Sequence, residues 1–182
     1  SGLYLDARRT DEALALARRA LTGADRAGDT LAAYRAGRVL ALSLEANGDR
    51  AGALDVMRRV ADQGERLRRD RLVEGVGDTV GSPTAGAMTS EARSTTGRYL
   101  SMLLDEVELG DDGDRQTRLR EVRDLLEIQR SAELEDHFGD ACLAQQATTS
   151  PDAIGGTLVL YPILLEDRVA LLTGFEGRFT YH

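Results

Sequence analysis

The fold is decided by GTLVLYPILLEDRVALLTGFEGRFTYH, residues 156–182. Its first part, TLVLYPILL, is a continuous apolar run of strand length, which predicts a strand buried on both faces. EDR predicts a tight polar turn and VALLTGF a returning strand, and Glu176-Gly177 predicts a two-residue turn into a last strand, RFTYH. Pro162 has no N–H to donate, so it predicts a bulge or an edge position. We therefore expect a three-stranded antiparallel meander.

Such a meander needs support from outside itself. Three strands with apolar side chains on both faces are not stable alone, and the last strand would present an unprotected edge. The sequence therefore predicts that something else finishes the sheet. We also expect the 182-residue chain by itself to aggregate or associate through that edge.

The composition limits the possible functions. The chain has a net charge of −8 and a pI near 4.9, which argues against a general nucleic-acid binder. All 23 basic residues are arginines, so no phosphate-loop, Schiff-base or pyridoxal-phosphate lysine exists, and we expect no cofactor. The single cysteine, Cys142, excludes an intramolecular disulfide and a cysteine-rich zinc site. With no signal peptide and no apolar run of about 20 residues, we expect a cytoplasmic protein without membrane contact.

Residues 1–73 carry the pattern of helical hairpins. Helices are expected over 10–29, 30–49 and 50–72, because apolar residues recur at three- and four-residue spacing. The first and third are self-similar: EALALARRAL and GALDVMRRVA align at a separation of 40 residues, with Ala13 matching Ala53. This period predicts a helical-hairpin repeat.

The same residues resemble the tetratricopeptide repeat. Its inter-helix turn and the small residue that follows correspond to Gly48, Asp49 and Ala53, although Met57 stands where an aromatic is usual and no closing proline follows. The resemblance implies a groove that binds a protein or peptide partner. Candidate contacts are Tyr34, Arg35 and Arg38, because arginine suits carboxylate recognition; the alternative is a solvated charged face.

Residues 74–98, rich in Gly, Ser and Thr, predict a flexible linker or loop. Helical pattern resumes over 99–146 and predicts a helical hairpin leading toward the strands. Its acidic cluster, Asp111, Asp112 and Asp114, lacks the ligand spacing of a calcium loop, so we expect no metal site and interpret Asp114 as a helix N-cap.

HFGDACL, residues 137–143, together with LVLYPILLEDRVALLTG, resembles the entrance to CHAT domains, which are caspase-like cysteine peptidases commonly preceded by tetratricopeptide repeats. The resemblance covers roughly residues 125–182. It implies a mainly α chain of tetratricopeptide-like hairpins, followed by an antiparallel meander that opens a caspase-like α/β domain. Residues 147–182 would then be the first strands of an incomplete CHAT domain.

The catalytic His–Cys dyad of that family does not carry over to this sequence. His182 has no following glycine, and Cys142 lies in a helical motif among apolar neighbours, which predicts a buried structural thiol. His137 precedes Cys142 by five residues, a poor spacing for contact on a helix. No catalytic residue is therefore predicted, and the chain alone should be inactive.

Two functions remain open at this point. In the first, the chain is the N-terminal regulatory or scaffold portion of a CHAT peptidase, completed by a C-terminal remainder in cis or as a separate chain. In the second, it is a non-enzymatic tetratricopeptide-type adaptor.

Overall fold

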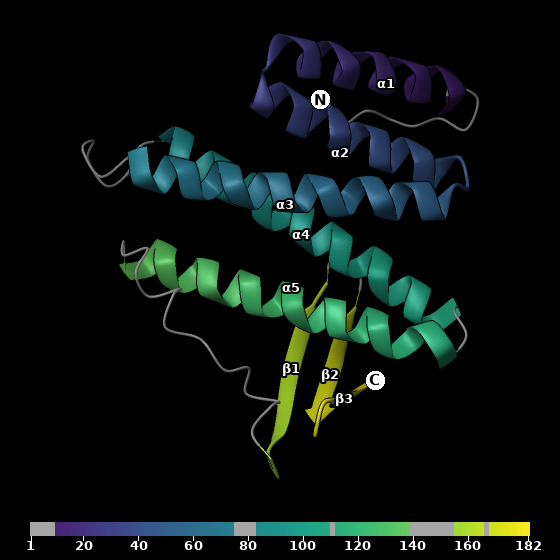
Figure 1. The fold of residues 1–182 in the computed structure, drawn as a ribbon, viewed down its shortest axis with the longest axis vertical. Coiled ribbons are helices and arrows are strands. Elements are labelled where there is room, and N and C mark those ends of the chain that lie inside the picture. Colours follow the sequence, from purple (N-terminus) through teal and green to yellow (C-terminus); the bar gives the residue numbers. More distant parts are fainter. Residues whose placement is uncertain (1–9, 75–82, 110–111, 139–154, 166–167) are drawn as a thin grey trace. The chain divides into compact units, whose positions relative to one another are not determined.

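The computed structural model describes residues 10–74, 83–109, 112–138, 155–165 and 168–182. Over these residues the protein is mainly helical, with a small antiparallel sheet, as the sequence predicts (Figure 1). The elements are α1 (Thr10–Ala27), α2 (Thr30–Ala46), α3 (Arg50–Glu74), α4 (Pro83–Leu109), α5 (Asp112–Phe138), β1 (Leu158–Leu164), β2 (Val169–Phe175) and β3 (Arg178–Tyr181). The chain divides into two compact units, residues 1–95 and 96–182, and the boundary falls inside α4.

In the first unit, α2 lies between α1 and α3 (Figure 1). The short turns that join them are built by capping residues. Gly28 and Gly48 adopt positive φ angles of 67° and 84°, which end α1 and α2. The Asp29 carboxylate accepts the N–H of Ala32, and the Asp49 carboxylate accepts the N–H of Gly52, so each aspartate caps the next helix. The three predicted helices are thereby confirmed.

The core of the first unit depends on close helix approach. A Cβ added to Gly37 of α2 would stand 2.6 Å from Cγ2 of Val60 on α3. A Cβ added to Gly64 of α3 would stand 2.7 Å from the ring of Tyr34. Glycine at these positions lets α2 and α3 pack with little space between their backbones.

The loop predicted over 74–98 is wrong from residue 83 onward, because α4 begins at Pro83, and wrong at Glu74, which ends α3. Residues 75–82 of the predicted loop lie outside the described residues. Proline suits the first position of a helix, where its missing N–H is not needed. Further along, Ala92, Thr95 and Tyr99 are buried at helical spacing. The buried stripe of this part of α4 therefore includes a small residue and a hydroxyl-bearing one rather than large aliphatic residues. A helix with such a stripe has the same composition as a loop, so the sequence pattern did not reveal it.

In the second unit, α5 and the C-terminal part of α4 pack beside each other and against one face of the sheet (Figure 1). Arg118 of α5 pairs with Glu106 of α4 at 2.6 Å. The helix α5 already begins at Asp112, so Asp114 lies in its first turn rather than at the N-cap. The core contains residues from both helices and all three strands: Tyr99, Leu103, Leu104, Val107, Leu119, Val122, Tyr161, Ile163, Leu172 and Phe179.

The sheet is the predicted meander, with strand order β1-β2-β3 and antiparallel pairing throughout. Glu176 and Gly177 have φ angles of 48° and 73°, the combination that a tight two-residue hairpin requires. Pro162 faces Leu171 in an unbroken register, so there is no bulge in β1. Leu171 exchanges both of its backbone hydrogen bonds with His182, so the nitrogen of Pro162 points to the outer edge of the sheet. The edge interpretation of Pro162 is confirmed.

The prediction that β1 is buried on both faces is wrong for this structure. Burial alternates along the strand: Tyr161 and Ile163 are buried against the helices, whereas Leu158, Leu160 and Leu164 are exposed. The continuous apolar run therefore supplies one covered face and one bare face.

Candidate protein-interaction surfaces

Tyr34, a predicted partner contact, is fully buried. Its hydroxyl lies 2.6 Å from Oγ1 of Thr95 and donates to the carbonyl oxygen of Glu91 at 3.1 Å. Burial raises the pKa of the Tyr34 phenol above its ordinary value, because the charged form would lose its hydration there. Tyr34 thus belongs to the core between α2 and the first part of α4, and it offers no surface to a partner.

Arg35 and Arg38, the other two predicted contacts, converge on the carboxylate of Glu91. Arg35 approaches it at 3.1 Å and Arg38 at 2.8 Å, and the guanidinium of Arg38 lies 5.9 Å from the centre of the Tyr34 ring. The hydrogen bond to Glu91 raises the pKa of the Arg35 guanidinium. The structure therefore brings all three predicted residues together around Glu91, a residue of the segment predicted as a loop and not itself predicted as a contact.

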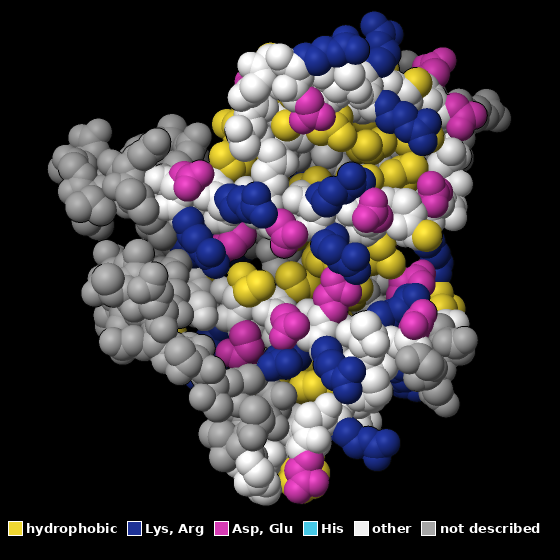
Figure 2. Space-filling model, viewed as in Figure 1, with side chains coloured by type: hydrophobic (Ala, Val, Ile, Leu, Met, Phe, Trp, Pro, Cys, Tyr) yellow, Lys and Arg dark blue, Asp and Glu magenta, His cyan; other side chains and the backbone are white. Residues whose placement is uncertain are grey.

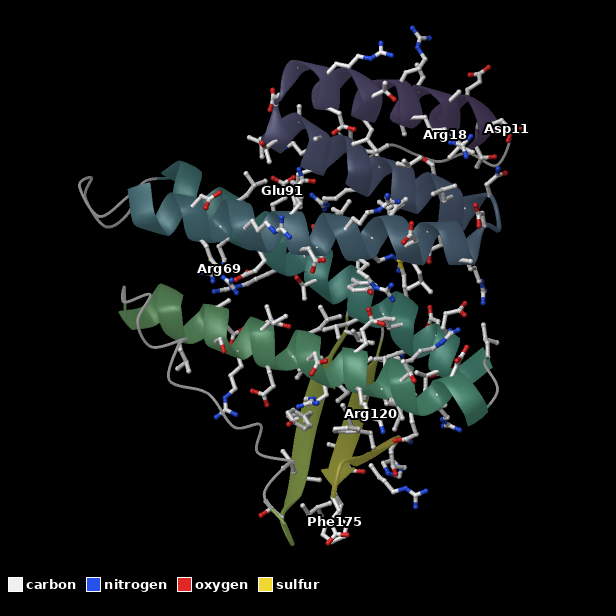
Figure 3. All side chains as sticks on the ribbon, in the orientation of Figure 1. Asp11, Arg18, Arg69, Glu91, Arg120 and Phe175 are labelled. Carbon is white, nitrogen blue, oxygen red and sulfur yellow. The ribbon has the colours of Figure 1, made fainter. Side chains whose placement is uncertain are left out.

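An apolar surface of the second unit lies on the side of the sheet that faces away from the helices, here called the open face. It consists of Leu158, Leu160, Leu164, Val169 and Phe175, all exposed, with Leu164 at 80%. Cross-strand pairing joins Leu158 to Phe175 and Leu164 to Val169, so the residues form one continuous patch. Figure 3 shows Phe175 at the hairpin end of β2, away from α5. A patch of this kind marks an interaction site on a folded protein.

The opposite face is fixed to the helices by polar contacts as well as apolar ones. Arg168 donates to Asp105 at 2.6 Å, Tyr181 donates to Glu108 at 2.9 Å, and Arg123 lies 5.5 Å from the centre of the Phe179 ring. Burial, and then the hydrogen bond to Glu108, raise the pKa of the Tyr181 phenol. Among the residues that the structure describes, the contacts that anchor the sheet all lie on this side.

Both outer edges of the sheet are blunted. On β1, Pro162 removes one outward donor. On β3, the side-chain amide of Gln116 donates to the carbonyl oxygen of Phe179 at 2.8 Å and accepts its N–H at 3.1 Å. The unprotected last edge predicted from the sequence is thus occupied at Phe179, and the open face is left as the surface to be covered.

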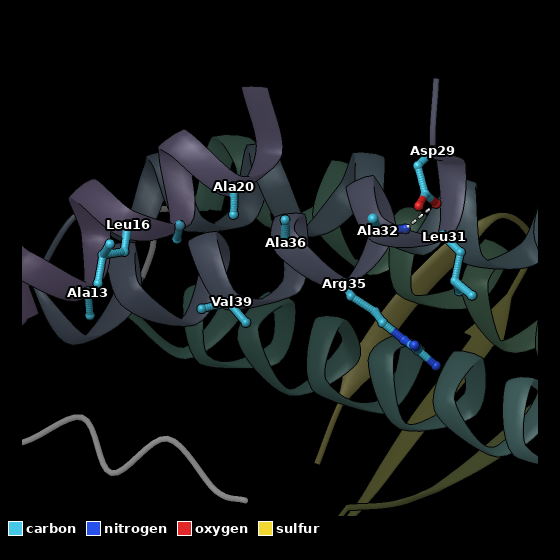
Figure 4. A pocket seen from close by; sticks show the side chains of 10 residues that line it. Ala13, Leu16, Ala20, Asp29, Leu31, Ala32, Arg35, Ala36 and Val39 are labelled. Carbon is cyan, nitrogen blue, oxygen red and sulfur yellow. Dashed lines mark hydrogen bonds between the residues drawn. The ribbon is translucent and has the colours of Figure 1, made fainter. Parts of the chain in front are cut away.

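A second apolar surface lies in the first unit, in a groove between α1 and α2 (Figure 4). The groove has a volume of about 540 Å³. Its floor and walls are small and aliphatic, with Ala13, Leu16 and Ala20 from α1 and Leu31, Ala36 and Val39 from α2. Figure 2 shows apolar side chains exposed over these two helices, between charged ones. We call this surface the α1–α2 groove.

Of the two histidines and the single cysteine of the sequence, only His182 has a side chain that the structure describes. Cys142 lies outside the described residues, and only the backbone of His137, on α5, is described. His182 is exposed and bonds through its backbone to Leu171. Among the residues that the structure describes, no three His, Cys, Asp or Glu side chains gather to hold a metal ion. Within the same residues, no helix combines the length and the apolar character needed to span a bilayer.

The sequence matches no protein-family model, and it matches no curated protein and no solved structure. The surfaces described above are therefore the observations that bear on function.

Proposed function

We propose that this chain is the N-terminal scaffold portion of a CHAT caspase-like cysteine peptidase, and that its sheet is completed by a polypeptide outside residues 1–182. The observation that carries the proposal is the open face. A sheet anchored to two helices on one side, with five large apolar side chains bare on the other, supports a role as one half of a larger domain.

The motifs HFGDACL and LVLYPILLEDRVALLTG support the peptidase family, since they resemble the entrance to a CHAT domain. In this proposal the His–Cys dyad lies in the completing polypeptide, either in cis or on a separate chain. This chain then positions and stabilises the catalytic half, and the peptidase reaction takes place in the completing polypeptide. The single cysteine fits a reducing cytoplasm.

The proposal is tested by labelling the natural gene product with an electrophilic probe for caspase-like cysteines. We expect labelling at a cysteine outside residues 1–182, retained when Cys142 is replaced by serine. The substitution Leu160→Glu on the open face should reduce labelling, because a buried carboxylate would oppose completion of the sheet. Leu109→Glu is the matched control, since Leu109 is similarly exposed on a helix. A gene product that ends with this chain and associates with no labelled polypeptide would exclude the proposal.

The non-enzymatic adaptor is the second candidate, and the α1–α2 groove is the observation that favours it. The two functions differ in one measurable respect. If the chain is an adaptor, its complex with a partner contains no polypeptide that the cysteine probe labels. If the chain is a peptidase scaffold, its complex always contains such a polypeptide.

A further inference from the structure

The internal repeat of the chain indicates what the α1–α2 groove binds. At the separation of 40 residues, Ala13, Leu16 and Ala20 of α1 correspond to Ala53, Val56 and Val60 of α3. The three residues of α3 are buried. Their counterparts on α1 line the groove, and Leu16 is 61% exposed. The same face is thus buried on α3 and exposed to solvent on α1.

On α3, this face is buried by another helix of the same chain. The helix that precedes α3, namely α2, packs on this face so closely that a Cβ on Gly37 would contact Val60. In a helical stack each repeat contacts only the adjacent repeats, and a repeat that ends the stack needs a polar outer face. The side of α1 that borders the groove carries Leu16 among alanines. It therefore has the character of an internal position rather than of a cap.

We propose that the α1–α2 groove binds an amphipathic helix of the α2 type, supplied by a partner polypeptide. The alanines of the groove allow the backbone of such a helix to approach closely, and Leu16 packs against its apolar stripe. The new contact continues the arrangement already seen between α2 and α3.

The charges at the groove define the partner further. Two charged residues are found among the described residues that line the groove, and both already have partners: the Asp29 carboxylate caps α2, and Arg35 pairs with Glu91. The buried stripe of the partner is accordingly uncharged, as that of α2 is, where Ala33, Gly37 and Leu40 face the core. The Arg35 side chain is 59% exposed, so an acidic residue at the margin of the partner helix can share it with Glu91.

This inference rests on the interaction role proposed for the helical repeats and is independent of the peptidase role. Its test uses the full chain and a fluorescent peptide of residues 29–49, cross-linked on its exposed side to keep it helical. We expect saturable binding in fluorescence anisotropy. Leu16→Glu in the protein should weaken binding by at least about tenfold, because it places a charge against an apolar stripe. Leu109→Glu should leave binding unchanged.

A peptide that carries Leu40→Asp is the second control, and it should not bind. Circular dichroism of each variant establishes that the helices are intact, which the exposure of Leu16 leads us to expect. Equal binding by the native protein and the Leu16→Glu variant would overturn the proposal. So would a dimer of the chain that disappears with Leu16→Glu while no peptide binds, since that result assigns the groove to a second copy.

Discussion

The side-chain amide of Gln116 pairs with the backbone of Phe179 as a neighbouring strand would, donating to its carbonyl oxygen and accepting its N–H. One residue of α5 thereby continues the hydrogen-bonding pattern of the sheet beyond β3. The contact also fixes the strand to the helix at a point where Phe179 is buried.

Replacement of Gln116 should therefore loosen β3. Gln116→Ala leaves two polar backbone groups of a buried residue without their partner, so we expect a loss of about 1–2 kcal/mol in the free energy of unfolding. Hydrogen exchange at the Phe179 amide should accelerate by more than exchange at Leu172 in the middle strand. Gln116→Glu keeps the acceptor but loses the donor, so it should be intermediate. Unchanged protection of Phe179 in Gln116→Ala would contradict this role.

Pro162 should protect the chain against edge-to-edge association. Pro162→Val restores an N–H on the outer edge of β1 and adds a residue with strand preference, so we expect faster growth of thioflavin-positive aggregates. The control is Leu164→Val, which changes an outward residue of the same strand without adding a donor. Equal aggregation rates for the two variants would mean that the apolar open face, rather than the strand edge, limits solubility.

Gly64 and Gly23 form a matched pair for testing helix packing. Gly64→Ala forces a methyl group to within 2.7 Å of the buried Tyr34 ring, so we expect a loss of about 1–3 kcal/mol in the free energy of unfolding. At Gly23 of α1 an added methyl group would meet no atom within 4 Å, so Gly23→Ala should stabilise by about 0.5–1 kcal/mol through helix preference. Urea denaturation measures the change in the free energy of unfolding for each variant. A change of the same sign in both variants would contradict close α2–α3 packing.

Alkaline pH should destabilise the first unit through Tyr34. Burial raises the pKa of its phenol in the folded state above the ordinary value of 10.0, which the unfolded chain retains. The resulting stability is fully present below pH 10 and is lost as the pH rises through the folded-state pKa. Tyr34→Phe keeps the ring and removes the titrating group. Denaturation midpoints between pH 8 and about pH 11 should therefore fall less steeply in this variant; identical slopes would remove Tyr34 as the cause.

The helices of the first unit and the meander could be predicted from the sequence because their signals are local. Gly48 and Asp49 mark a turn by their own backbone and capping preferences, and Glu176-Gly177 marks a hairpin in the same way. The start of α4 could not be predicted, since its buried Thr95 is recognisable only through the hydroxyl of Tyr34, 61 residues away. The sequence also predicted a partner-binding surface at Tyr34, Arg35 and Arg38. It did so because their contacts with Glu91, more than 50 residues away, are visible only in the structure.

The sheet also has a bearing on the order of folding. The paired residues farthest apart in the sequence are Leu158 and Phe175, so every strand pairing is local in sequence. Local pairings close early because they cost little chain entropy. The meander can therefore be in place on α4 and α5 before any distant segment reaches it, so its three exposed leucines are presented on a sheet that has already formed.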